Sequence, residues 1–301
     1  MKIQLKENNN YLPFEDFKYI CDWLKTSDED EIVIKWEGDI NEDYLSKIIN
    51  FIITESYLGV MKFFLEVDAD KLKTEYLDIF ERIFVNIPNF LDENGKIKLF
   101  DNLDSIYKER GKDVFSNPKT NAYIVVFSSL MEERGCDIET FWEVVRRYGS
   151  NDVRMQLKYP ENVKNKEEYY KNLVPTYMRW IENVIDNSVF AVLDGMQIPV
   201  CYFTSEQLSL VAANSGNWHT MFGSMLKDLT VYPDMTLSCF LSKDTREINL
   251  RDISTYERLK EKILTMETQY TLQNYLPKCN DCILKRWNKC QGGCWIIQKG
   301  E

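Results

Sequence analysis

The first two thirds of the chain alternate short apolar runs with longer segments whose apolar residues recur at helical spacing. Runs rich in Ile, Val and Phe predict strands buried on both faces of a parallel sheet: Lys2–Leu5, Ile32–Trp36, Lys62–Leu65, Arg82–Ile87, Ala122–Phe127 and Val153–Leu157. Amphipathic segments predict the helices Pro13–Leu24, Glu42–Ile53, Thr74–Phe80, Asn102–Glu109, Ile138–Arg147 and Glu168–Ile185. Successive β-α units of this kind predict an α/β fold with right-handed crossovers, closed as a barrel or left partly open.

The pattern changes after about residue 190. Strands are predicted at Val189–Leu193 and Gln197–Phe203, a hairpin at Leu229–Tyr232 and Thr236–Phe240, and a charged helix at Thr255–Thr265. No Pro-, Gly- or Ser-rich linker marks the change. We therefore predict two domains within continuous structure, a β/α domain over 1–190 and a small α+β domain over 191–301.

Composition and charge narrow the class of protein. A hydrophobic fraction of 44% supports a sizeable core and excludes a disordered chain. The 37 basic and 48 acidic residues give a net charge of −11, which repels phosphate backbones and argues against nucleic acid as a partner. The N-terminus lacks a signal-peptide apolar region, and no window reaches the roughly 18 apolar residues of a membrane span. These features predict a cytoplasmic protein without a membrane partner.

Cysteine supplies the candidate chemistry. Four of the eight cysteines lie in the last 23 residues as Cys279, Cys282, Cys290 and Cys294, and the others are scattered. A Cys-x₂-Cys pair can direct two sulfurs at one metal centre, so the cluster predicts a metal site, with buried or disulfide-bonded cysteines as the alternative. Zinc and an iron–sulfur cluster use the same ligands, and the spacing does not choose between them.

The cysteine segment, together with the hairpin before it, resembles a known family. Cys-x₂-Cys-x₇-Cys-Gln-Gly-Gly-Cys, preceded by the hairpin from Val231 through Cys239 to Phe240, resembles the SPASM domain that follows the barrel of many radical SAM enzymes. Gln197–Phe203 resembles the passage between the two domains. The resemblance implies a TIM-barrel-like partial (β/α)6 barrel of radical SAM type over 1–190, then a cysteine-rich, metal-binding SPASM-like α+β domain over 191–301.

Two features of active radical SAM enzymes are missing at their expected places. Such enzymes carry a Cys-x₃-Cys-x₂-Cys loop after the first strand, whose three thiolates hold a cluster with one iron open to S-adenosylmethionine. Here Lys2–Leu5 continues through Lys6–Tyr11 into the first helix, and the lone Cys21 falls inside that helix. A Gly-Gly-Glu-Pro-like motif should follow the second strand, where this chain has Trp36-Glu37-Gly38-Asp39-Ile40. We predict a pseudo-radical SAM protein that does not cleave S-adenosylmethionine.

The SPASM-like part is also reduced. The family uses about seven or eight thiolates for two auxiliary clusters, whereas only Cys239, Cys279, Cys282, Cys290 and Cys294 match here. The glycine of the hairpin is replaced by Met235. Five ligands cannot complete two clusters, so the resemblance implies one metal centre of structural role, zinc or [4Fe-4S]. Cys279, Cys282 and Cys290 are its firmest ligands.

Two other positions are candidates for binding. His219, the only histidine, lies where a further SPASM ligand is expected, although a polar loop histidine without a metal is the commoner case. Glu37 and Asp39 follow the second strand, at the end of a barrel where binding sites gather. Their carboxylates would suit a peptide amine or a Lys side chain, and a solvated strand end is the alternative.

These expectations combine into a function hypothesis. The protein is predicted to be a catalytically inactive radical SAM/SPASM homologue. It would bind a peptide or protein substrate, or pair with an active radical SAM enzyme, in the maturation of a ribosomally synthesised peptide or protein. The alternatives are a metalloenzyme or redox protein that uses the C-terminal centre, and a zinc-stabilised scaffold.

Overall fold

The computed structural model describes residues 1–27, 30–87, 93, 100–110, 123–127, 152–156, 200–201, 229–238, 246 and 248–273. The chain divides into two units. The first comprises Met1–Glu66, Asp78–Glu81 and Gly216–Trp295, and the second comprises Val67–Leu77, Arg82–Ser215 and Ile296–Glu301. The elements predicted at Ile138–Arg147, Glu168–Ile185 and Val189–Leu193 lie outside the described residues. Residue 190 does so too, and the domain boundary stays a prediction.

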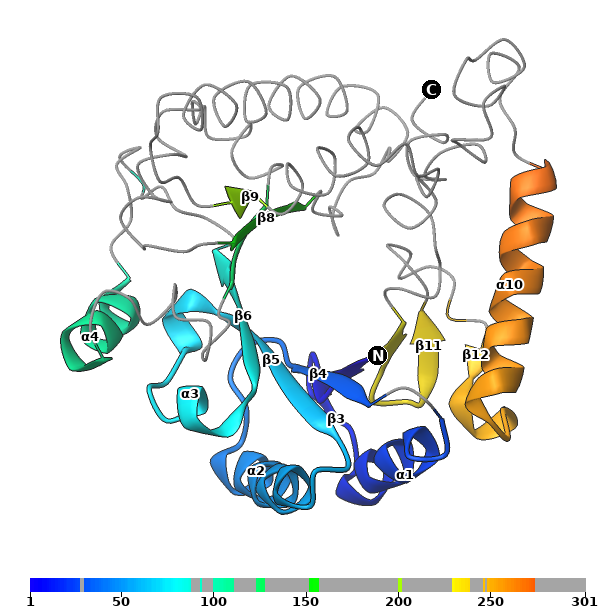
Figure 1. The fold of residues 1–301 in the computed structure, drawn as a ribbon, viewed down its shortest axis with the longest axis horizontal. Helices are drawn as coiled ribbons and strands as arrows, with labels where there is room; N and C mark the ends of the chain where they lie inside the picture. The colour runs from blue at the N-terminus through cyan, green and yellow to red at the C-terminus, as the bar shows by residue number, and fades with distance from the viewer. Residues whose placement is uncertain are drawn as a thin grey trace, which may run out of the picture. The chain divides into compact units, whose positions relative to one another are not determined.

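The sheet of the first unit joins segments from both ends of the chain. The parallel strands β1 (Lys2–Gln4), β4 (Glu31–Lys35) and β5 (Lys62–Asp68) lie in that order. Only the part of β5 up to Glu66 belongs to this unit. On the other edge, β10 (Thr230–Val231) pairs in parallel with β1, and β11 (Thr236–Ser238) and β12 (Ile248–Asn249) follow in antiparallel register (Figure 1). The predicted hairpin thus extends the sheet that begins with the first strand.

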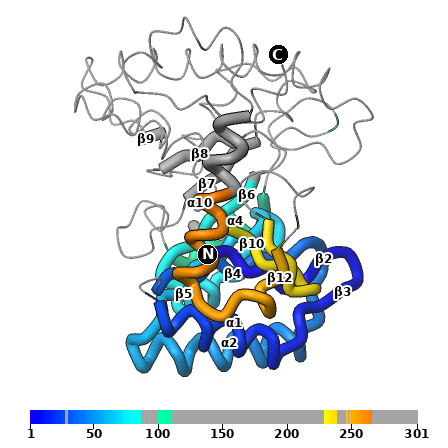
Figure 2. The backbone as a smooth tube through the Cα atoms, turned by 90° about the vertical axis from the view of Figure 1, so that its right-hand side faces the viewer, coloured from blue at the N-terminus to red at the C-terminus, as the bar shows by residue number. Residues whose placement is uncertain are grey.

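Two helices cover one side of β4 and β5. They are α1 (Phe14–Leu24) and α2 (Glu42–Tyr57), which lie side by side in both views (Figure 2). Helix α2 begins after Asn41, whose Oδ1 accepts a hydrogen bond of 3.0 Å from the backbone N–H of Tyr44. The rings of Phe17 and Phe51 meet edge to face, with centroids 5.5 Å apart. The first two predicted helices are confirmed, the second with an extra turn.

The apolar core of the first unit is formed by alternate side chains along its strands. Ile3, Ile34 and Leu65 are paired in register across β1, β4 and β5, and all three side chains are fully buried. Successive side chains of a strand point to opposite faces, so this row forms the apolar face toward the helices.

The long C-terminal helix of the first unit, α10 (Tyr256–Gln273), is anchored to α1. Trp23 Nε1 donates a hydrogen bond of 3.1 Å to the carbonyl of Ile253, and the indole meets the Tyr256 ring edge to face at 5.8 Å. The 3₁₀ turn η3 (Leu250–Asp252) leads into this contact. The helix was predicted only as far as Thr265; it runs two further turns.

The second unit repeats the parallel pattern. Strands β6 (Arg82–Ile87), β7 (Tyr123–Phe127), β8 (Asp152–Gln156) and β9 (Val200–Cys201) pair in that order, all parallel. The helix α4 (Asp101–Arg110) is tied to η1 (Ala69–Lys71) through Asn102, whose Nδ2 donates to the carbonyls of Asp70 and Leu72. The predicted helix at Thr74–Phe80 is the single turn α3 (Tyr76–Ile79). A mixed α/β fold rich in parallel strands is confirmed.

Within the part of the chain that the structure describes, no helix is both long enough and apolar enough to cross a bilayer.

Candidate functional site

The connection between β1 and α1 is a tight hairpin. Strands β2 (Lys6–Glu7) and β3 (Asn10–Tyr11) pair antiparallel, and Asn8 at the turn has a φ of 54°, in the left-handed region that Asn tolerates. The backbone N–H of Leu12 donates a hydrogen bond of 2.8 Å to the carbonyl of Leu5 and closes the base. The direct connection predicted from the sequence is confirmed, and its hairpin form was not foreseen.

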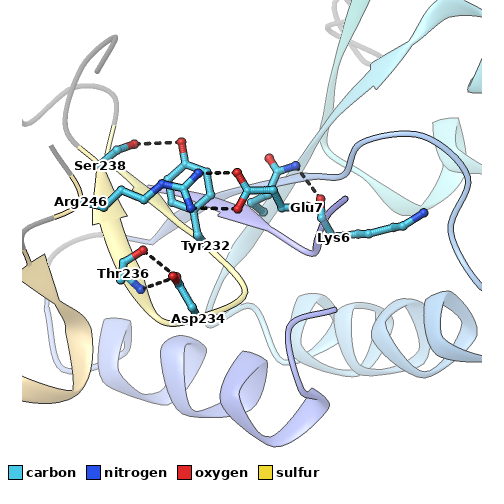
Figure 3. A network of polar contacts seen from close by, with 8 residues as sticks. Lys6, Glu7, Tyr232, Asp234, Thr236, Ser238 and Arg246 are labelled. Atoms are coloured by element: carbon cyan, nitrogen blue, oxygen red, sulfur yellow. Dashed lines mark hydrogen bonds and ion pairs between the residues drawn. The ribbon is translucent and has the colours of Figure 1, made fainter. Parts of the chain in front are cut away.

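Arg246 fastens this hairpin to the C-terminal part of the first unit. Its guanidinium donates two hydrogen bonds to the Glu7 carboxylate, one of them 2.8 Å from Nη1 to Oε2 (Figure 3). The same group lies 3.4 Å from the centroid of the Tyr232 ring, and Ser238 Oγ donates a bond of 3.1 Å to Tyr232 Oη. The hydrogen bonds to Glu7 raise the pKa of Arg246. The Glu7 and Arg246 side chains are 20% and 22% exposed, so the pair is largely withdrawn from water.

The turn of the β10–β11 hairpin places Met235 in a left-handed backbone conformation. Met235 has a φ of 67°, a conformation that Gly adopts freely and other residues rarely take. This is the position where the resemblance implies Gly. The Met235 side chain is buried, and Asp234 Oδ1 accepts hydrogen bonds from the backbone N–H (3.0 Å) and the Oγ1 (2.6 Å) of Thr236.

The β2–β3 hairpin also contacts the connection between β4 and α2. The carbonyl of Lys6 accepts hydrogen bonds from Gln4 Nε2 (2.7 Å) and from the backbone N–H of Glu37 (3.3 Å). Lys6 Nζ donates to the backbone carbonyl of Asp39. Gly38 between these residues has a φ of 64°. The resemblance places the cluster loop in one of these segments and the S-adenosylmethionine motif in the other, and here they are hydrogen-bonded directly to each other.

Cys21, the cysteine that follows the β2–β3 hairpin most closely in the sequence, is not positioned to bind a metal together with other described thiols. Cys21 lies inside α1, as predicted, and is fully buried. Burial raises its pKa, since the thiolate would lose its hydration. No other cysteine occurs before residue 136. The donor set after the first strand does not fit a cluster that needs three thiolates.

The buried thiol predicts a difference in alkaline stability. The native state keeps the Cys21 proton at pH values where the unfolded chain releases it, so the folded pKa lies above the unfolded value of about 8.5. We expect the free energy of unfolding to fall by up to about 1.4 kcal/mol per pH unit above that value, relative to Cys21→Ala. Urea unfolding between about pH 7 and pH 10 measures this. If the free energies of unfolding of the wild type and of Cys21→Ala change in parallel over this pH range, the prediction is contradicted.

A polar row lies on the other face of the first sheet. Gln4, Lys35 and Glu66 are paired in register at the carboxyl ends of β1, β4 and β5. Lys2 Nζ lies 2.9 Å from Glu66 Oε2, and Lys35 Nζ lies 3.4 Å from Glu66 Oε1. These residues were not singled out from the sequence. The sequence did contain a signal for them: polar residues alternate with apolar ones in β1, β4 and β5, whereas strands buried on both faces are usually apolar throughout.

The predicted metal ligands are not among the described residues. Cys239, Cys279, Cys282, Cys290 and Cys294 all lie outside them, as does His219. Ser238, which precedes Cys239, is buried in β11. The residues that the structure does describe contain no group of three or more His, Cys, Asp or Glu side chains placed to hold a metal. The ligand set stays a prediction.

Glu37 and Asp39 are described, and they lie after β4 as predicted. Glu37 is half-buried and Asp39 is exposed. The structure brings their backbone groups to the β2–β3 hairpin. A role of their carboxylates in binding a peptide stays a prediction.

Comparison with solved structures identifies the fold. No protein-family model and no curated protein matches the sequence. The structure of anSMEcpe with bound AdoMet has a TM-score of 0.62 and 11% identity, over 100% of this chain and 90% of that one. Native anSMEcpe with bound AdoMet and Cp18Cys peptide has a TM-score of 0.60 and 12% sequence identity, over 100% of this chain and 91% of that one. SuiB of Streptococcus suis bound to S-adenosylmethionine has a TM-score of 0.53 and 13% sequence identity, over 98% of this chain and 70% of that one. These are radical SAM enzymes, and the chain has the radical SAM fold.

Proposed function

We propose that this protein is a catalytically inactive radical SAM/SPASM homologue that serves as a binding or partner component in the maturation of a ribosomally synthesised peptide or protein. The observation that carries the proposal is the connection between β1 and α1. It is the hairpin Lys6–Tyr11, without a thiol, and the Glu7–Arg246 pair fastens it in place.

The missing ligands remove the radical chemistry. Splitting S-adenosylmethionine requires an electron from a cluster held by three thiolates, and no Cys-x₃-Cys-x₂-Cys spacing occurs anywhere among the eight cysteines. The hairpin is hydrogen-bonded to Glu37 and Asp39, the segment where the family binds the cofactor's amino group. The fold is therefore retained while the residues for turnover are replaced.

Binding of a peptide is supported by the fold. One solved structure with the same fold contains a bound Cp18Cys peptide. Parallel β/α folds form their binding sites at the carboxyl ends of the strands, independently of the chemistry that each site performs. Loss of the cluster leaves that end of the first sheet in place, with Glu37 and Asp39 beside it as candidates to bind an amine.

One metal centre of structural role completes the proposal. Four thiolates from Cys239, Cys279, Cys282, Cys290 and Cys294 would hold zinc or a [4Fe-4S] cluster and order the C-terminal segment. A closed four-thiolate site has no open position for catalysis, which distinguishes it from the metalloenzyme alternative.

Capture of native partners tests the binding role. Tagged protein, purified without oxygen from the organism that encodes it, is expected to retain a ribosomally made peptide or a radical SAM enzyme, identified by mass spectrometry. The Arg246→Met variant, in which the hairpin no longer receives the hydrogen bonds from Arg246 to Glu7, is purified in the same way for comparison. Recovery of neither class of partner would contradict the proposal and favour the zinc-stabilised scaffold.

A further inference from the structure

The β2–β3 hairpin carries an ammonium group that is bound by two other segments of the first unit. Lys6 Nζ donates a hydrogen bond to the backbone carbonyl of Asp39, in the connection between β4 and α2. The same nitrogen lies 5.5 Å from the centroid of the Tyr11 ring, within the range of a cation–π contact. The Lys6 side chain points away from the Glu7–Arg246 pair (Figure 3). The Asp39 carbonyl and the Tyr11 ring together form what we call the ammonium site.

Contacts other than that with Lys6 hold the Tyr11 ring in place. Tyr11 Oη accepts a hydrogen bond of 3.2 Å from the backbone N–H of Asn41, and the ring meets that of Tyr44 edge to face, with centroids 5.2 Å apart. Tyr44 Oη in turn donates a hydrogen bond of 2.6 Å to the carbonyl of Leu12. None of these contacts uses the Lys6 side chain, so the ring is expected to keep its place when that side chain is removed.

Fastening the hairpin does not require the Lys6 ammonium. The hairpin is already held by the two hydrogen bonds from Arg246 to Glu7, and the backbone N–H of Glu37 bonds the Lys6 carbonyl without the side chain. A hydrogen bond from an exposed ammonium to a carbonyl contributes little net free energy, because water competes for both groups. The contact is therefore weak enough for an ammonium from outside the chain to replace it.

The residues present do not fit S-adenosylmethionine at this segment. In the family that the chain resembles, the segment after the second strand binds the amino group of the cofactor. Here that segment already accepts a hydrogen bond from an ammonium of the chain itself. A second ammonium at the same carbonyl and the same ring face would be repelled by the first.

We propose that Lys6 is an internal occupant of the ammonium site, and that an amine ligand binds there only by displacing it. The chemistry is that of the ammonium that the structure shows in place, and it is shared by the amino group of S-adenosylmethionine and by the N-terminal amine of a peptide. This deepens the proposed function, on which it rests: the protein is inactive both because it lacks the cluster and because its own lysine excludes the cofactor.

Removing the ammonium and supplying it again tests the site. Lys6→Ala removes the propylammonium end of the side chain, which n-propylammonium chloride replaces. At about 100 mM, this salt is expected to raise the unfolding temperature of the full-length Lys6→Ala variant by about 2 °C relative to sodium chloride at the same concentration. The wild type and Lys47→Ala, a change of an exposed lysine on α2, are expected to show no such rise, because Lys6 fills the site in both.

Titration with larger amines distinguishes the two sources of the ammonium. The probes are S-adenosylmethionine, Gly-Gly-Gly amide with a free amine, and its acetylated form, each followed by isothermal titration calorimetry. Lys6→Ala is expected to bind at least one of the free amines about tenfold or more tightly than the wild type does. The acetylated peptide is expected to gain nothing. A gain for S-adenosylmethionine identifies the cofactor as the ligand that Lys6 excludes, and a gain for the free peptide identifies a peptide amine.

Three results would overturn the inference. They are equal stabilisation of Lys6→Ala and Lys47→Ala by n-propylammonium, no free amine that binds Lys6→Ala more tightly than the wild type, and an equal gain for the acetylated peptide. Should Lys6→Ala fail to fold, acetylation of the wild type followed by mass spectrometry decides. Lys6 is expected to react at least about tenfold more slowly than Lys47, because its ammonium is bound, and equal rates overturn the inference. None of these results touches the proposed function, which turnover of S-adenosylmethionine or the recovery of neither class of partner contradicts.

Discussion

Replacing Arg246 by Met is expected to lower the free energy of unfolding by about 2–4 kcal/mol, measured by urea unfolding of the full chain. The variant leaves the Glu7 carboxylate, 20% exposed, without the two hydrogen bonds it accepts from the guanidinium. It also removes the cation that lies 3.4 Å from the Tyr232 ring centroid. Removing one member of a largely buried pair costs more than the pair contributes, because the remaining charge stays desolvated.

A second arginine on the same unit supplies the matched control. Arg251 donates to both carboxylate oxygens of Asp16, at 2.7 and 2.8 Å, but its side chain is 60% exposed. Arg251→Met is expected to cost no more than about 1 kcal/mol. Pairing Arg246→Met with Glu7→Gln should recover part of the loss, since no unpaired charge remains. Equal costs for the two arginines would contradict the view that the Glu7–Arg246 pair fixes the hairpin.

Replacing Cys282 by Ser is expected to remove the bound metal and to lower the unfolding temperature strongly. Structural zinc sites contribute about 10–16 kcal/mol of apparent binding free energy, and one lost thiolate of four opens the site. Metal analysis of anaerobically purified protein measures the loss directly. Cys136→Ser, outside the C-terminal cluster, is expected to keep full metal content. Because the ligands bind as thiolates, metal affinity should also fall as the pH is lowered.

Spectroscopy on the same samples separates the remaining alternatives. Zinc without an electron paramagnetic resonance signal after reduction would favour the binding component. A reducible cluster would favour the redox alternative, and Cys282→Ser would then lose the signal. Full metal content in Cys282→Ser would contradict the assignment of Cys282 as a ligand.

The central elements of the fold could be predicted because buried parallel strands have a distinctive composition. The apolar run Ile32–Trp36 and the amphipathic segment Pro13–Leu24 were sufficient to place β4 and α1. Cys21 was placed correctly within that helix for the same reason. Strands of two residues, such as β2 and β12, have no periodicity to detect.

Contacts between residues far apart in the sequence could not be predicted from the sequence alone. Glu7 and Arg246 are 239 residues apart, and nothing in either segment indicates that they meet. The Lys35–Glu66 pair follows from strand register, which a single sequence does not fix. The lack of a Cys-x₃-Cys-x₂-Cys spacing after the first strand was visible in the sequence, whereas the hairpin formed by β2 and β3 required the structure.

The most direct test of the central claim is turnover of S-adenosylmethionine by the anaerobically purified protein. The protein, treated with iron and sulfide and supplied with dithionite, is incubated with S-adenosylmethionine. 5′-Deoxyadenosine is then quantified by mass spectrometry, beside an active radical SAM enzyme as a positive control. We predict no 5′-deoxyadenosine above the background of reductant alone, because no Cys-x₃-Cys-x₂-Cys loop follows the first strand. Formation of 5′-deoxyadenosine over repeated turnovers would contradict the account.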